Sequence, residues 1–165
     1  PIQCDNLQEL IEVGRQTFLE TFESTNTAED MESYLADTFN EEQLLSELKN
    51  KGSAFYFAKV NGNIAGYLKL NFGTAQTEAN HADGAEIERI YLYRQYQGSG
   101  LGQFVLDSAI ALICKTKPLY VWLGVWEHNA KAIRFYERNG FERFSQHVFI
   151  LGEDVQTDIL MKRYF

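Results

Sequence analysis

A glycine-rich stretch is the part of the chain whose residue types point most clearly to chemistry. Residues 93–103, YRQYQGSGLGQ, carry Gly98, Gly100 and Gly102 at alternate positions in front of an apolar helical pattern. Glycine is unfavourable inside a helix, so this spacing indicates a need for bare backbone. Backbone N–H groups at a helix start bind anions, and glycine lets a phosphate approach them. The stretch predicts an anion site, with a tight turn that binds nothing as the alternative.

Two familiar phosphate motifs do not match this stretch. The dinucleotide fingerprint G-x-G-x-x-G requires glycine where Gln103 stands, and the Gly-Lys-Ser/Thr ending of a P-loop is absent from the sequence. If the loop binds an anion, it does so as another class of site, and the tight turn that binds nothing stays open as the alternative.

Two further places carry residues that could hold a ligand or move a proton. Asn129 and Tyr136 are seven residues apart, which is two helical turns, so they share one face of a helix. Glu86, Glu88 and Leu92 fall at alternate positions of a strand pattern, which places them on one face. Structural roles are the alternatives: a buried helix aromatic for the tyrosine, and an ion pair with the following arginine for the carboxylates.

The elements that must position these residues follow from capping and periodicity. Pairs with capping-box spacing open three helices, an Asn-Gly turn joins two aromatic strands, and alternation marks the later strands. In order, we expect helices at 5–22, 27–39 and 40–51, a hairpin of strands 53–60 and 64–72, a polar loop at 73–84, a strand at 85–93, a helix at 100–115, a strand at 119–126, a helix at 129–138, and an antiparallel pair at 141–151 and 157–165. This order predicts a mixed α/β sheet covered by helices.

Composition sets the broad class of protein. The 165 residues are 45% hydrophobic with only two prolines, which favours one ordered domain spanning residues 1–165. No apolar run approaches the roughly 18 residues of a membrane span, and no secretory pattern opens the chain. Cys4 and Cys114 form no disulfide framework, and no Cys/His cluster suggests a metal. We therefore expect a cytoplasmic protein with no metal and no membrane partner.

Charge is distributed unevenly along the chain. Residues 1–50 contain 12 acidic and 2 basic side chains, a net charge of −10, whereas the whole chain carries −8 and the remainder +2. So acidic a chain is not expected to bind nucleic acid. A cationic partner near the N-terminal third is one interpretation, and a solvated acidic surface is the other.

The glycine loop and its neighbours resemble a known superfamily. QYQGSG at 95–100 is similar to the Q/R-x-x-G-x-G/A signature of the GCN5-related N-acetyltransferases (GNAT). IERIYL at 87–92 resembles the fourth strand of that family, and VWLGVWEHNAKAIRFYERNGF at 121–141 resembles its fifth strand and the helix after it. The resemblance implies the GNAT fold, with a mixed, mostly antiparallel sheet, splayed fourth and fifth strands, and flanking helices.

A narrower resemblance covers nearly the whole chain. TFLETF, EDMESYLADTFN, IERIYL, WLGVWEHN and FILGEDVQTDILM together look like the PaiA-type spermidine/spermine N-acetyltransferases. This resemblance implies acetyl transfer from acetyl-CoA to a primary amine of a small polycation, by direct attack in a ternary complex.

The resemblance also implies which residues hold coenzyme A. The loop main chain is expected around the pyrophosphate, the strand beside the pantetheine arm, and the later helix near the same arm. The implied cofactor-binding residues are Ile90, Tyr91, Leu92, Gln97, Gly98, Ser99, Gly100, Leu101, Gly102, Gln103, Asn129, Ala132, Phe135 and Tyr136.

Three groups are expected to act in the reaction. By resemblance, the Leu92 N–H faces the thioester oxygen, and the Tyr136 hydroxyl gives a proton to the departing thiolate. Glu88 is the candidate base for the amine. It stands about 13 Å from Leu92 along an ideal strand, which favours a water relay or a shortening bulge.

The acceptor is expected to enter beside the first two helices. The candidate substrate-binding residues are carboxylates and aromatics, namely Glu20, Phe22, Glu32, Tyr34, Asp37 and Glu86. Carboxylates would pair with charged ammonium groups, and the rings would face the methylene stem. His147, in a closing strand, is expected to be structural or exposed.

Alternatives remain open from sequence. The acceptor could instead be a peptide, protein or other small amine, or the chain could be a non-catalytic acyl-CoA-binding module. The sequence does not give the oligomeric state, and a homodimer is one option.

Overall fold

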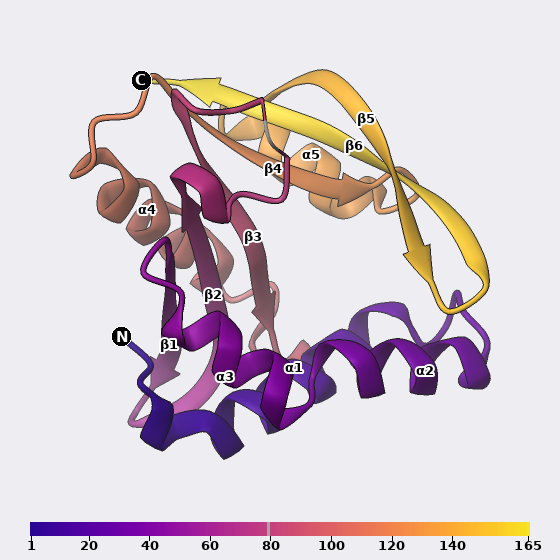
Figure 1. The fold of residues 1–165 in the computed structure, drawn as a ribbon. Coiled ribbons are helices and arrows are strands. Elements are labelled where there is room, and N and C mark those ends of the chain that lie inside the picture. Colours follow the sequence, from indigo (N-terminus) through magenta and orange to yellow (C-terminus); the bar gives the residue numbers. More distant parts are fainter. Residues whose placement is uncertain (79) are drawn as a thin grey trace.

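A six-stranded sheet with helices on both faces forms the fold, in a computed structural model that describes residues 1–78 and 80–165 (Figure 1). The helices are α1 (Leu7–Phe22), α2 (Ala28–Thr38), α3 (Glu41–Lys49), α4 (Leu101–Cys114) and α5 (Ala130–Arg138). The strands are β1 (Ser53–Val60), β2 (Asn63–Phe72), β3 (Gly84–Leu92), β4 (Tyr120–Trp126), β5 (Glu142–Leu151) and β6 (Asp154–Tyr164). Three short 3-10 turns are η1 (Cys4–Asn6), η2 (Gly73–Ala75) and η3 (Arg94–Tyr96).

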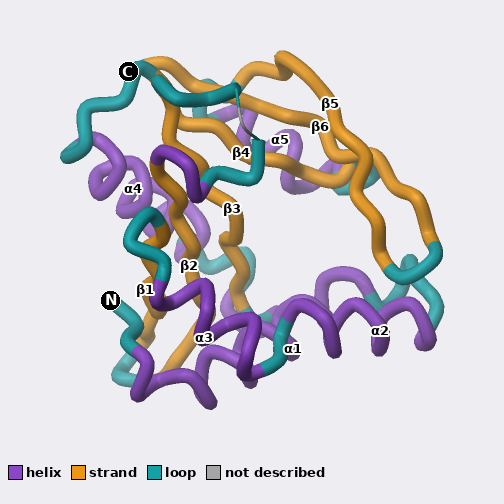
Figure 2. Tube along the Cα trace, in the orientation of Figure 1, coloured by secondary structure: helices purple, strands orange, loops and turns teal. Residues whose placement is uncertain are grey.

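The sheet has the order β1-β2-β3-β4-β6-β5, and only the β3–β4 pair is parallel. The predicted mixed, mostly antiparallel sheet with flanking helices is therefore confirmed. Figure 2 shows α1, α2 and α3 on one side of the sheet and α4 and α5 on the other. Each side has its own buried core, one centred on Leu106 and Ile133 and one on Leu10 and Phe18.

Most predicted element ends agree with the structure, and two do not. The side chains of Thr27 and Asn40 cap α2 and α3 as predicted, each accepting from the N–H three residues on. The predicted cap at Asp5 is wrong, because η1 occupies that position and α1 begins at Leu7. The last strand begins at Asp154 rather than at 157, because Leu151 and Asp154 pair directly across a two-residue turn. The predicted polar loop at 73–84 includes residue 79, which lies outside the described residues.

None of the described helices combines the length and the apolar character that a membrane span requires. Within the same described residues, no group of three or more His, Cys, Asp or Glu side chains is placed to hold a metal ion.

The strands β3 and β4 pair at one end only. Their parallel register covers three residue pairs and stops at Glu86 and Trp122. The splaying expected between the family's fourth and fifth strands lies here, between β3 and β4. From Ile87 to Leu92, the edge of β3 that faces away from β2 has no strand partner among the described residues.

A β-bulge interrupts β3 where the two strands part. Lys69 of β2 pairs with Arg89, but the next residue, Leu70, pairs with Ile87. Glu88 is therefore the extra residue of the bulge. A bulge shifts the alternation of side chains by one position.

The shift separates residues that strict alternation placed on one face. Ile90 and Leu92 belong to the core under α4 and α5, whereas Tyr91 packs into the core under α1, α2 and α3. The expectation that Glu86, Glu88 and Leu92 share one face is therefore wrong, because the carboxylates precede or form the bulge and Leu92 follows it.

Candidate active site

The turn from β3 into α4 depends on two glycines. Gly98 has φ +76° and Gly100 has φ +86°, the left-handed region that other residues rarely adopt. Gly100 is also the N-cap of α4, and no side chain of the described residues caps this helix. The turn therefore presents backbone rather than side chains at the start of α4.

A run of free N–H groups follows from this geometry. Among the described residues, none accepts a hydrogen bond from the backbone N–H groups of Gly98 to Gln103, and Phe104 is the first to donate, to Gly100 at 3.2 Å. A side chain at Gly102 would meet only Leu92 Cδ1, at 3.9 Å. The fold itself therefore does not require glycine at 102, and the open space over these N–H groups suits a polyanion such as a pyrophosphate.

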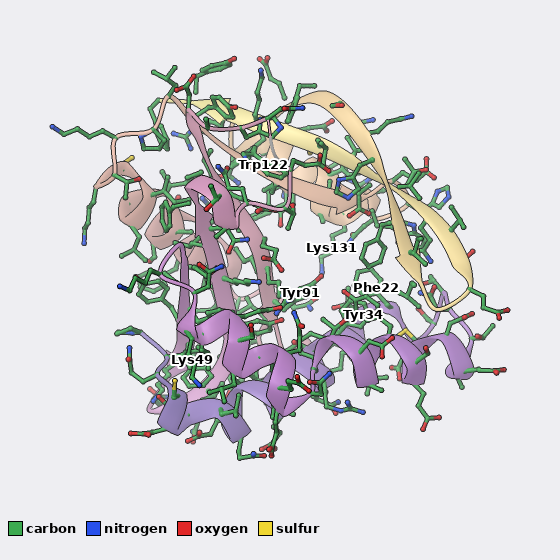
Figure 3. All side chains as sticks on the ribbon, viewed as in Figure 1. Phe22, Tyr34, Lys49, Tyr91, Trp122 and Lys131 are labelled. Atoms are coloured by element: carbon green, nitrogen blue, oxygen red, sulfur yellow. The ribbon has the colours of Figure 1, made fainter. Side chains whose placement is uncertain are left out.

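The glycine signature fits this loop in a second frame as well. The signature can also be aligned two residues further along the chain, because Gln97 to Gly102 has the same spacing, Q-x-x-G-x-G. This second alignment overlaps the residues with free N–H groups more closely. Gln97 donates to the Leu92 carbonyl at 3.2 Å and accepts from Lys131 of α5 at 3.4 Å. Lys131, labelled in Figure 3, thus places a cation beside the loop. Lys131 could not be predicted from the sequence, because an exposed lysine on a helix carries no signal of its own.

The open edge of β3 presents its own donors. Tyr93 donates its N–H to the Ala65 carbonyl of β2 at 2.9 Å. Successive N–H groups along a strand point alternately toward and away from the neighbouring strand. The N–H groups of Leu92 and Ile90 therefore point away from β2, toward the gap before β4. The predicted donor at Leu92 is thus aimed at that gap.

Helix α5 brings the two predicted polar side chains to the same region. Asn129 caps the helix, with its Oδ1 accepting from the Ala132 N–H at 3.1 Å, so its amide NH₂ stays available. Tyr136 is 8% exposed and packs against Phe135 and Phe141. Among the described residues its hydroxyl has no hydrogen-bond partner, and burial raises the pKa of Tyr136. The hydroxyl therefore stays protonated at neutral pH.

Glu88 lies in a cluster of paired charges. Its carboxylate contacts Lys69 Nζ at 2.6 Å and Arg89 at 3.1 Å, and accepts from Asn71 at 2.5 Å. Glu47 of α3 holds the same two cations, at 2.8 Å and 2.9 Å. Against the opposing effect of burial, Arg89 and Lys69 lower the pKa of Glu47. The ion-paired role weighed for Glu88 is thus present, and its role as base stays a prediction.

Glu86 is held by donors of the loop after β2 and shares the Asn71 amide with Glu88. It is buried, and it accepts from the Thr77 N–H at 2.8 Å, the Thr77 hydroxyl at 2.5 Å and the Asn71 amide at 3.0 Å. Burial raises the pKa of Glu86, while these donors oppose the shift. The structure therefore gives Glu86 a place beneath the loop after β2.

The predicted aromatic residues gather between the first helices and the sheet. Phe22 meets the Tyr91 ring edge-on at 6.4 Å, and Tyr34 stacks on Phe18 at 4.5 Å. Figure 3 shows Phe22, Tyr34 and Tyr91 together at this side of the sheet. They form an aromatic wall on the side from which an acceptor could reach the gap.

The predicted acidic residues do not join that wall. Glu32 and Asp37 lie on the exposed face of α2, whereas Tyr34 is turned toward the core. Glu20 accepts from the Arg94 N–H at 2.6 Å, so it ties α1 to the turn after β3. The structure brings the predicted aromatics together and leaves these carboxylates outside them.

Comparisons with known proteins agree with this arrangement. The family model described as the Acetyltransferase (GNAT) family matches residues 8–141. An uncharacterised N-acetyltransferase of Lactobacillus delbrueckii subsp. lactis is 47% identical over 158 residues, covering 96% of this chain and 91% of its own. The spermidine N(1)-acetyltransferase of Thermoplasma acidophilum is 27% identical over 145 residues, covering 86% and 85% of the two chains.

A solved structure resembles the whole fold. The PaiA N-acetyltransferase of Thermoplasma acidophilum, solved with coenzyme A, superposes with a TM-score of 0.80 at 24% identity, over 99% of this chain and 96% of its own. With the family model covering most of the sequence and the expected sheet in place, this chain belongs to the GNAT family of acetyltransferases.

Proposed function

We propose that the chain transfers an acetyl group from acetyl-CoA to a primary amine of a small polycation such as spermidine or spermine, by direct attack in a ternary complex. The observation that carries the proposal is the run of N–H groups from Gly98 to Gln103 that have no acceptor in the described part of the chain, next to the open edge of β3. The spermidine acetyltransferase relative and the PaiA fold support the choice of amine.

Residues on the α4 and α5 side would hold the cofactor. The N–H groups of the loop would bind the pyrophosphate, with Lys131 adding a positive charge. The edge of β3 from Ile90 to Leu92 would pair with the amides of the pantetheine arm. The free Asn129 amide, with Ala132 and Phe135 beside it, would face the same arm. Acetyl-CoA supplies the activated thioester.

Two groups of this chain would act on the transferred group. The Leu92 N–H would donate to the carbonyl oxygen as negative charge develops on it. The Tyr136 hydroxyl would give its proton to the sulfur, since a thiolate with a conjugate acid near pKa 8.5 accepts a proton readily. Burial raises the pKa of Tyr136, so the proton is present when it is needed.

Glu88 would take the proton of the amine through water. Its side chain is 16% exposed, and its ion-pair partner Lys69 also contacts Glu47 of α3, so it lies on the acceptor side of the sheet. The pairs with Lys69 and Arg89 would fix its position. Phe22 and Tyr34 would face the carbon chain of the acceptor, while the exposed carboxylates Glu32 and Asp37 would attract it over a longer range.

A turnover assay with acetyl-CoA tests the proposal. Thiol release should be fastest with spermidine or spermine, slower with diamines, and slowest with a monoamine or a peptide amine. If the protein binds acetyl-CoA in calorimetry and acetylates none of these amines, the enzymatic proposal fails. If peptide amines are preferred, the polyamine assignment fails.

A further inference from the structure

Asp158 of β6 is a carboxylate that the reaction scheme leaves unused. It stands opposite Trp126 of β4 on one side and His147 of β5 on the other. Its side chain is only 18% exposed, and the contact recorded for it is a long one to His147 rather than a short hydrogen bond. The nearest cation is His147 Nε2, at 3.7 Å. Largely buried carboxylates normally have donors, so an open one is informative.

The neighbouring histidine, His147, also contacts a second carboxylate, that of Glu78. His147 Nδ1 lies 2.8 Å from Glu78 Oε1 on the loop after β2, closer than its Nε2 lies to Asp158. Asp158 first, and Glu78 with it, raises the pKa of His147 against the effect of burial. Even with His147 charged, the three groups together keep a net negative charge.

Aromatic rings border the same carboxylate. Trp126, the cross-strand partner of Asp158, meets Phe22 at 6.1 Å, and Phe22 meets Tyr91 at 6.4 Å. Burial raises the pKa of Tyr34 and of Tyr91, and the Asp158 charge adds to both shifts. Asp158 therefore lies close enough to influence both tyrosines of the aromatic wall, which are labelled in Figure 3.

A glycine keeps space open beside the carboxylate. Gly124 lies in the middle of β4 and is exposed, and a Cβ there would stand 3.4 Å from Asp158 Oδ2. Its neighbours on the same strand face, Trp122 and Trp126, carry large side chains. Glycine inside a strand weakens it and often marks the close approach of a ligand.

We propose that Asp158 binds a second, non-reacting ammonium group of the acceptor, in a site walled by Phe22, Trp126 and Tyr91 and kept open by Gly124. A carboxylate beside aromatic faces is suited to an alkylammonium ion. The site makes the preferred acceptor a diamine or polyamine, with one amine at the gap between β3 and β4 and another at Asp158. The inference rests on the proposed function.

The variant Asp158→Asn tests the site, because it removes the charge and keeps the shape. The KM for spermidine and for 1,4-diaminobutane should rise by at least about tenfold, since the variant removes a hydrogen-bonded charge from the contact with the ammonium group. The KM for acetyl-CoA and for n-butylamine should change by less than about twofold. Asp5→Asn, the same change at an exposed residue of η1, is the matched control and should alter none of these values.

Other outcomes would overturn the inference. If Asp158→Asn raises the KM for n-butylamine as much as that for the diamine, the carboxylate does not bind a second ammonium group. If kcat falls equally for all amines with KM unchanged, Asp158 is a proton acceptor instead. An unchanged KM for every amine also refutes the site.

A binding measurement separates this inference from the proposed function. Calorimetry with spermidine alone, without acetyl-CoA, should show weaker binding to Asp158→Asn than to the wild type and to Asp5→Asn. If the wild type acetylates no amine but this difference is found, the proposed function fails and the ammonium site stands. If spermidine is acetylated but binds both proteins equally, the site fails and the function stands.

Discussion

Gly102 differs from the other glycines of the loop at the scale of single residues. It lies in the first turn of α4 with ordinary φ, and a methyl group there would meet only Leu92 Cδ1 at 3.9 Å. Gly98 and Gly100 have positive φ, so side chains there would strain the loop itself. Gly102 therefore allows the binding site to be altered without disturbing the fold.

We predict that Gly102→Val weakens acetyl-CoA binding by at least tenfold, because its branched side chain is larger than the glycine or alanine that the signature allows and enters the space over the free N–H groups. The melting temperature of the ligand-free protein should stay about the same, since valine is a better helix former than glycine. Calorimetry and thermal unfolding give the two readouts. Unchanged affinity with a normal melting temperature would remove this turn from the cofactor site.

Tyr136 is buried, and among the described residues its hydroxyl has no partner. Tyr136→Phe should therefore leave the melting temperature nearly unchanged while kcat falls by about 10²-fold, within the usual range for acid catalysis. Full turnover by the folded variant would exclude the hydroxyl from the reaction.

Glu88 has two separable roles, which a pair of variants can distinguish. Glu47→Gln breaks ion pairs to the same two cations without changing Glu88, so it should lower the melting temperature and leave kcat/KM nearly unchanged. Glu88→Gln should lower kcat/KM by at least about 10²-fold. Equal effects of both variants would leave Glu88 as a structural ion-pair residue.

At the scale of elements, the hairpin β5–β6 is fixed to the rest of the fold by polar contacts. The Glu153 N–H donates to Asp30 of α2 at 2.8 Å, and Gln156 donates to Asn26 at 2.7 Å. Figure 1 shows the hairpin reaching toward α2. On its inner face, His147 links the hairpin to Glu78 of the loop after β2.

The link through His147 should depend on pH. The folded state raises the pKa of His147, so its contribution to stability is fully present below about pH 6.5, the unfolded value, and is lost as pH rises through the folded value. His147→Gln should therefore lower the melting temperature at pH 5.5 and much less at pH 9. His128→Gln, at a side chain 72% exposed, is the control and should show no such difference. A loss that is equal at both pH values would mean that His147 acts by packing alone.

Local residue patterns predicted the helices and strands well. They could not predict the strand register or the order of the strands in the sheet, because both depend on residues far apart in the sequence. Capping residues and the Asn-Gly turn act over three or four residues, so Thr27 and Asn40 were readable from sequence. The bulge at Glu88 depends on the register against β2, and strict alternation therefore misplaced Leu92. Asp158 was missed for a similar reason, because only the sheet order brings the last strand beside the aromatic wall.

At the scale of the whole molecule, the acidic first third of the chain packs on one side of the sheet, and α4, which follows the glycine loop, packs on the other. The first 50 residues, with net charge −10, form α1, α2 and α3, and the glycine loop belongs to the part with net charge +2. Exposed carboxylates such as Glu32 and Asp37 contribute only about 0–1 kcal/mol each, so their effect on a polycation is collective.

We predict that kcat/KM for spermidine falls steeply between about 0.1 M and 1 M salt, as the Debye length shortens from about 10 Å to about 3 Å. The fall should be smaller for a monoamine of similar length. Neutralising Glu20, Glu32 and Asp37 together should raise the KM for spermidine more than that for acetyl-CoA. Equal effects on the monoamine and the polyamine would make the acidic third a solvated surface only.

The short pairing of β3 with β4 has a mechanical consequence. The sheet is two three-stranded halves, β1-β2-β3 and β4-β6-β5, joined by three residue pairs at one end and bridged at the other by the contacts between α2 and the hairpin. A molecule that fills the gap would complete the sheet as a removable seventh strand. Because only the folded state offers that gap, the cofactor would act as a folding partner, and the lifetime of the protein would follow the cofactor supply.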